Sequence, residues 1–194
     1  MTGMKSEITP TTEPLLELFY QALSDEESEV QCNAAFAVGL LVEHSHKDLS
    51  PQYLHLLSAL HPLIEVPPNS PLSRLKAHDN AVGAVSRLIV RNTAAVPLDQ
   101  ILPVVINALP LRHDLLENPP VFKAIFHLFN TNPQALHPYS DRLLQLFRAV
   151  LEPTALDQTN DETRAGLIEL IGVLNKEAPE KVQAAGLGPF VPGQ

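Results

Sequence analysis

The sequence has a single cysteine, no tryptophan and only 5% aromatic residues. One cysteine cannot build a disulfide framework, and this fits a reducing compartment. No apolar run approaches the roughly 18 residues that a membrane-spanning helix needs, so the sequence predicts no membrane contact. The first residues lack the apolar stretch of a secretory signal peptide. A cross-linked extracellular scaffold and a membrane-spanning protein are therefore both disfavoured.

Motifs of the common catalytic centres are also missing. The sequence contains no H-E-x-x-H, no cysteine pair, no G-x-S-x-G and no glycine-rich phosphate loop. The eight histidines are scattered. We interpret Cys32, inside an expected helix, as a half-buried packing residue and not as a nucleophile. The sequence therefore predicts neither an enzyme nor a metal or cofactor site.

Basic residues are scarce in the first quarter of the chain. The formal net charge is −9, and residues 1–50 contribute −7 of it, with nine acidic and two basic side chains. This balance argues against nucleic acid as a direct ligand, because phosphate binding needs lysine and arginine. It favours a basic partner, which a negative field attracts. Solubility alone is the alternative reading of such an acidic surface.

Proline is abundant, with 18 residues, and most prolines fall between apolar runs. This placement punctuates a series of short helices, because proline ends a helix or begins one. Alternating strand patterns are scarce, and 45% hydrophobic residues suffice for a continuous aliphatic core. The sequence predicts helices over residues 13–23, 29–44, 49–64, 72–91, 97–109, 119–130, 133–151, 161–176 and 179–185.

The second of these helices carries a pattern that recurs along the chain. Its small apolar residues follow helical spacing and would let another helix approach closely: Val30, Ala34, Ala37, Val38 and Leu41. The string from Asn33 to Leu41 returns as Asn80 to Leu88, with looser echoes at 124–128 and 167–171. The spacings are 47, 40 and 43 residues. A helical repeat of this period is typical of HEAT and armadillo solenoids.

We therefore predict an all-α fold, an α-solenoid of about four HEAT repeats made of antiparallel helix pairs. The solenoid is expected over residues 13–187, between a flexible N-terminal segment, 1–12, and a tail, 188–194. Neither end of the predicted solenoid shows a clear polar cap. At the front, the aromatic side chains of Phe19 and Tyr20 suggest packing against a preceding repeat. The chain is expected to be a fragment of a longer superhelix.

The second helix of each pair would line a concave, acidic surface. There carboxylates can receive lysine or arginine, amides can hold an extended backbone, and Phe36 can support an aliphatic stem. By the repeat, Gly83 and Arg87 should share this exposure. The alternative is that Asn33 and Asn80 bind neighbouring turns, and that the acids cap helices. The candidate cargo-peptide-binding residues are Glu29, Asn33, Phe36, Glu43, Asp79, Asn80, Glu117, Asn118, Asp161 and Glu162.

Four segments, 31–41, 79–88, 96–103 and 108–114, resemble in order the C-terminal HEAT repeats of importin-β-type karyopherins. The resemblance covers about residues 13–187. One departure is Pro119-Pro120, which stands where the first two repeats have asparagine, so a continuous asparagine ladder is not expected.

This resemblance implies a nuclear import receptor that shuttles between cytoplasm and nucleus through the nuclear envelope pore. Its implied cargo is basic, such as core histones and ribosomal proteins, and its implied pore partners are Phe-Gly nucleoporins. Ran GTPase would bind upstream repeats that are not in this chain. The alternative function is a HEAT-repeat scaffold subunit that assembles other proteins.

Overall fold

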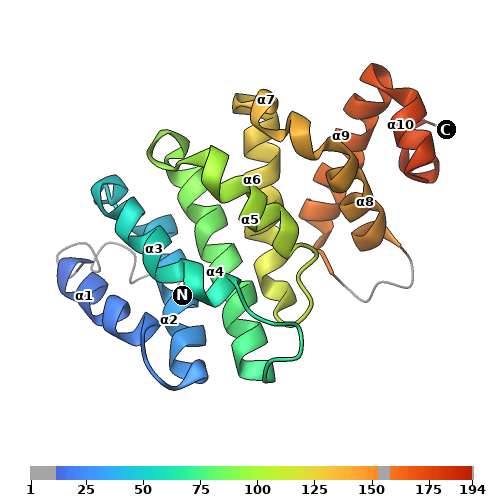
Figure 1. Cartoon of the computed structure of the whole chain (residues 1–194). Helices are drawn as coiled ribbons and strands as arrows, with labels where there is room; N and C mark the ends of the chain where they lie inside the picture. Colours follow the sequence, from blue (N-terminus) through green and yellow to red (C-terminus); the bar gives the residue numbers. More distant parts are fainter. Residues whose placement is uncertain (1–11, 153–157, 194) are drawn as a thin grey trace. The chain divides into compact units, whose positions relative to one another are not determined.

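The computed structural model describes residues 12–152 and 158–193, which contain helices and no strand (Figure 1). The predicted all-α class is confirmed. The chain divides into two compact units, Met1–Val121 and Phe122–Gln194, and each is described by itself. The predicted flexible segment 1–12 lies outside the described residues, apart from Thr12, at which the first helix begins.

The first unit holds five complete α-helices and the start of a sixth among its described residues. Three short 3₁₀ turns, η2 (Ser50–Gln52), η3 (Thr93–Ala95) and η4 (Leu115–Glu117), lie between them. The α-helices are α1 (Thr12–Leu23), α2 (Ser28–His44), α3 (Tyr53–Ile64), α4 (Leu72–Arg91), α5 (Leu98–Ala108) and α6 (Asn118–Thr131), which continues into the second unit.

Successive helices of the first unit pair, and the pairs lie side by side. α1 packs on α2 and α3 on α4, while α2 contacts α4 and α1 contacts α3. Gly39 permits the close approach of α2 to α4, because a Cβ atom there would lie 3.2 Å from the Ala84 Cα atom. The predicted small-residue contact is thus confirmed for Ala34 and Val38, which are buried, whereas Val30 is 39% exposed.

The described residues of the second unit are also helical. Phe122 of α6 lies with its ring centroid 6.4 Å from that of Phe147 in α8. The predicted single segment 133–151 is broken, because the turn containing Pro138 separates two helices. The elements are α7 (Pro133–Leu136), η5 (His137–Tyr139), α8 (Ser140–Leu151), α9 (Asp161–Glu177), α10 (Pro179–Ala184) and η6 (Gly188–Phe190).

The residues predicted as a tail, 188–194, pack in part against the second unit. Gly188 is buried next to the fully buried Leu187, and η6 contacts α9. A Cβ atom on Gly172 would lie 3.1 Å from the Pro192 Cδ atom. Residues up to Pro192 therefore contact this unit, although Pro192 itself is exposed, while Gln194 lies outside the described residues.

A side-chain cap begins α9. The Asn160 Oδ1 atom accepts a hydrogen bond of 2.8 Å from the Thr163 backbone N–H. We expect Asn160→Ala to lower the free energy of unfolding by about 1 kcal/mol, since one N–H of the first turn loses its partner. Urea denaturation followed by circular dichroism measures this loss. The control Asn107→Ala alters an exposed asparagine of α5 and should change stability by less than about 0.5 kcal/mol.

Candidate functional site

An acidic turn joins α1 to α2, and four of its carboxylates are exposed: Asp25, Glu26, Glu27 and Glu29. Two hydrogen bonds fix this turn. The Asp25 Oδ1 atom accepts the Glu27 backbone N–H at 2.8 Å, and the Gln31 amide donates to the Asp25 carbonyl at 2.8 Å. We call residues 25–29 the acidic turn. Its charges are held together at the positive end of the α2 dipole.

The exposed face of α2 continues from this turn. Glu29, Asn33 and Phe36 follow one another at spacings of four and three residues, which places them on one side of the helix. All three are exposed, Phe36 by 40%. We call these three residues the α2 face. It combines a carboxylate, an amide and an aromatic ring, as the sequence predicts.

Glu43, further along α2, is only half-exposed. Its Oε2 atom accepts a hydrogen bond of 3.0 Å from the Arg87 Nε atom of α4. The Arg87 guanidinium therefore neutralises part of the charge that was predicted to serve a peptide. Glu43 lies at the edge of the α2 face and joins it to a buried network below.

That network corrects the predicted exposure of Arg87 and Glu117. Arg87 is 8% exposed and Glu117 is fully buried. The Arg87 guanidinium donates two hydrogen bonds to the Glu117 carboxylate, Nη1–Oε2 at 2.5 Å and Nη2–Oε1 at 3.3 Å. Burial raises the pKa of the Glu117 carboxyl, and the Arg87 hydrogen bond and charge oppose that rise. The pair links η4 to α4 inside the protein, so Glu117 is not at a binding rim.

Asp79 is also buried, at 1% exposure, and not on the rim. Its Oδ2 atom accepts three backbone N–H groups, from Arg112 at 3.1 Å, His113 at 2.7 Å and Asp114 at 2.8 Å. Its Oδ1 atom lies 2.8 Å from His78 Nδ1. Burial alone would raise the pKa of Asp79, but the hydrogen bonds from His78 and the loop outweigh it and lower the pKa. The carboxylate anchors the loop before η4.

Two predicted amides are buried as well. Asn80 is 4% exposed, and its Nδ2 atom donates to the Cys32 carbonyl at 3.3 Å and contacts Cys32 Sγ at 3.1 Å. Asn118 is 1% exposed. The alternative reading, that the repeated asparagine binds a neighbouring turn, thus describes Asn80. Asn80 is covered by Cys32 of α2, whereas Asn33 of α2 is itself exposed.

The last two predicted acids belong to the second unit. Asp161 and Glu162 are exposed in the first turn of α9. They are not its side-chain cap, since Asn160 has that role. Their charges favour the positive end of the helix dipole. Their predicted part in peptide binding stays a prediction.

Three further features bear on function: the reactivity of Cys32, metal binding and membrane-spanning helices. Cys32 is half-buried, and burial raises the pKa of its thiol, which disfavours the reactive thiolate. Within residues 12–152 and 158–193, no group of three His, Cys, Asp or Glu side chains is placed to hold a metal ion. None of the helices in these ranges has the length and apolarity for a bilayer crossing.

Sequence reasoning missed the buried ion pair. A signal for it exists, because Gly83 precedes Arg87 by four residues and therefore shares its side of α4. A Cβ atom on Gly83 would lie 1.6 Å from the Glu117 Oε2 atom. At this position the glycine leaves room for the Glu117 carboxylate beside Arg87.

Comparison with known proteins gives three informative relatives and no matching family model. The chain is 40% identical over 178 residues to the probable importin subunit beta-4 of Schizosaccharomyces pombe, covering 92% of the chain and 16% of that protein. It is 28% identical over 171 residues to human importin-4, covering 88% and 15%. For mouse importin-4 the identity is 26% over 165 residues, covering 83% and 14%.

The chain therefore spans about 15% of the length of the curated relatives it matches. The match runs through almost all of the chain, and the paired helices of the first unit agree with it. The chain is thus homologous, over about nine tenths of its own length, to a segment of importin-4 and importin subunit beta-4, in the importin-β family.

Proposed function

We propose that the chain is a segment of a nuclear import receptor whose acidic turn and α2 face bind a basic cargo. The cargo would present a lysine-rich localisation segment, as in core histones or ribosomal proteins. One observation carries the proposal: four exposed carboxylates of the acidic turn continue directly into the exposed amide and ring of the α2 face. Homology to importins supports the transport role.

Each group has a chemical part in this proposal. The acidic turn attracts a lysine-rich segment and pairs with its ammonium groups. The Asn33 amide offers both a donor and an acceptor to an extended backbone. The Phe36 ring supports the aliphatic stem of a lysine. Because α2 is braced on α4 through Glu43 and Arg87, these groups keep their spacing before the peptide arrives.

The buried residues have a supporting part instead. Asp79 anchors the loop before η4, Asn80 bonds to α2 and Glu117 pairs with Arg87. These three residues and Asn118 are buried, so none is exposed to a peptide. Asp161 and Glu162 form a separate exposed acidic pair in the second unit and are proposed as a further contact for the same cargo.

A transport role also entails partners beyond the cargo. Phe-Gly nucleoporins would bind the receptor during passage through the nuclear envelope pore. Ran GTPase would bind repeats outside this chain. The receptor would accordingly be found in both cytoplasm and nucleus.

Binding of a labelled histone-tail peptide, followed by fluorescence anisotropy, tests the proposal. Glu29→Lys should weaken binding about fivefold or more, since it removes one attractive charge and adds a repulsive one. Raising the ionic strength from about 0.05 M to about 0.3 M should weaken binding of the unaltered chain, because salt screens exposed charges.

The matched control is Asp99→Lys. Asp99 is exposed in the first turn of α5, as Glu29 is in the first turn of α2, so both changes alter the net charge and a helix dipole alike. The control should bind the peptide within about twofold of the unaltered chain. An affinity that does not change with ionic strength, or that falls equally in Glu29→Lys and Asp99→Lys, would contradict a site at the α2 face.

A further inference from the structure

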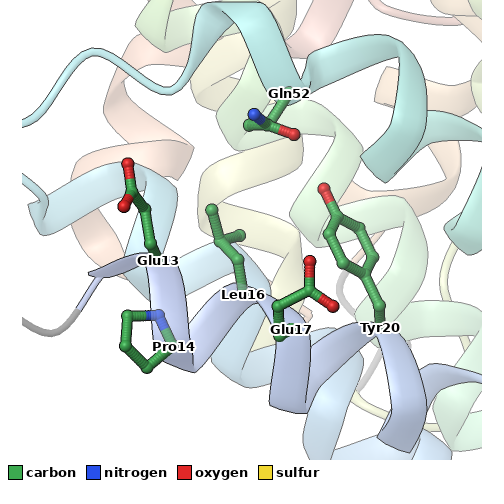
Figure 2. A pocket seen from close by; sticks show the side chains of 6 residues that line it. All are labelled: Glu13, Pro14, Leu16, Glu17, Tyr20 and Gln52. Atoms are coloured by element: carbon green, nitrogen blue, oxygen red, sulfur yellow. The ribbon is translucent and has the colours of Figure 1, made fainter.

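A second feature of the first unit is a hollow between α1 and η2, away from the α2 face. It measures about 490 Å³ and opens to solvent. Five residues of α1 and one of η2 line it: Glu13, Pro14, Leu16, Glu17, Tyr20 and Gln52. Figure 2 shows Glu13, Leu16 and Tyr20 extending from α1 toward the side where Gln52 lies.

The walls of this hollow combine apolar surface with carboxylate oxygens that can accept hydrogen bonds. Leu16 is 5% exposed and forms an apolar floor. The Glu13 and Glu17 carboxylates are exposed and four residues apart, so they share one side of α1. Among the described residues, Glu17 has no ion-pair partner, and the buried Tyr20 hydroxyl has no hydrogen-bond partner.

The aromatic wall is held rigidly. The Tyr20 ring stacks on the His55 ring of α3, with centroids 4.0 Å apart and an interplanar angle of 10°. Its orientation is therefore set before any ligand arrives. A flat aromatic wall next to carboxylates suits the planar guanidinium, which stacks on rings and carries five donors.

One carboxylate of the hollow already pairs with a cation of the chain. The exposed Lys47 ammonium donates a hydrogen bond to the Glu13 Oε1 atom. This contact lowers the pKa of the Glu13 carboxyl, chiefly through the Lys47 hydrogen bond. The exposed Glu17 carboxylate stays available to a second cation from outside.

From these contacts we propose that the hollow binds an arginine side chain of a basic peptide. The aliphatic stem would lie on Leu16, and the guanidinium would stack beside the Tyr20 ring and donate to the Glu17 carboxylate. The occupant is thus a polypeptide with arginine, in contrast to the lysine-rich segment on the α2 face. The hollow gives a basic cargo a second contact on α1.

A titration of the ¹⁵N-labelled chain tests this inference. The probe is a capped glycine–serine peptide carrying two arginines, and the readout is the shift of backbone amide signals. Signals of Leu16, Tyr20 and Gln52 should move together and saturate. Replacing both arginines with lysine should weaken binding at these signals about threefold or more, since an ammonium cannot stack and bridge as a guanidinium does.

Two substitutions sharpen the test. Glu17→Gln should weaken binding of the arginine peptide about three- to tenfold, while Glu169→Gln, an exposed glutamate of α9 with the same change in charge, should leave it within about 1.5-fold. Tyr20→Phe removes only the buried hydroxyl and keeps the ring, so binding of the arginine peptide should stay within about twofold.

The location of the shifts separates this inference from the proposed function. Shifts at Glu29 and Asn33 alone would overturn the inference and leave the α2 site standing. Shifts at Leu16, Tyr20 and Gln52 alone would support the hollow, and the α2 face would still be tested separately by the lysine-rich histone-tail peptide. Equal binding by Glu17→Gln and the unaltered chain, or no shift at the hollow, also overturns the inference.

Discussion

Replacing Glu117 with alanine should lower the free energy of unfolding by about 3 to 5 kcal/mol. Glu117 is fully buried and receives two hydrogen bonds from Arg87, which is itself 8% exposed. Removing the carboxylate leaves the guanidinium buried with only the Glu43 contact that the structure shows for it. A buried charge that loses its main partner is among the costliest changes in a protein. Urea denaturation followed by circular dichroism measures the loss.

Gly83→Ala is a second, independent test of the buried pair of Arg87 and Glu117. The added Cβ atom would lie 1.6 Å from Glu117 Oε2 and 2.6 Å from Glu117 Cδ. Because burial and Arg87 confine that carboxylate, it cannot simply swing away. Gly83→Ala should therefore be costly in the unaltered chain and much less costly in Glu117→Ala, a coupling of at least about 1 kcal/mol.

The exposed Glu177, at the end of α9, supplies the control for this set. Glu177→Ala should change stability by less than about 0.5 kcal/mol. Additive costs for Gly83→Ala and Glu117→Ala would contradict the described contact between the helix backbone and the carboxylate.

Asp79→Ala should be the other severe change, at about 3 kcal/mol. It removes the acceptor of three backbone N–H groups, from Arg112, His113 and Asp114, and the partner of His78. Buried donors that lose their acceptor keep their full desolvation penalty. Asp99→Ala, at an exposed carboxylate, should cost less than about 1 kcal/mol. A loss for Asp79→Ala as small as the control would contradict the anchoring role.

The same carboxylate predicts a dependence on pH. Hydrogen bonds lower the pKa of Asp79 in the folded protein below its ordinary value. The stability that this group contributes is therefore complete well above the unfolded pKa of about 3.9, and it is lost as the pH falls through that value and further. In Asp79→Asn, which cannot ionise, this part of the acid destabilisation should be absent.

The helices themselves could be predicted from the sequence, because proline and helical spacing are local signals. The predicted span 72–91 is the span of α4, Leu72–Arg91. The span 133–151 was wrong in one respect, since the turn His137–Tyr139 interrupts it. Pro138 was noticed early in the segment, but whether a proline kinks or ends a helix depends on the packing around it.

Exposure was harder to predict than helix position. Asn33 and Asn80 occupy the same place in a repeated string, yet only Asn33 is exposed. Arg87 was expected at the surface from its place in the repeat, and Asp79 and Glu117 from their places near the starts of predicted helices. Their burial depends on partners 30 to 35 residues away in the chain, such as Glu117 for Arg87 and His113 for Asp79. No local pattern encodes such pairs, and only the spacing of Gly83 and Arg87 hinted at one.

A crystal structure of the chain bound to a lysine-rich histone-tail peptide tests the central claim most directly. We predict an extended peptide along α2, with a lysine ammonium on the Glu29 carboxylate, its stem on the Phe36 ring, and its backbone bonded to the Asn33 amide. A peptide seated elsewhere with α2 bare, or a chain that binds no such peptide at low salt, would contradict the account.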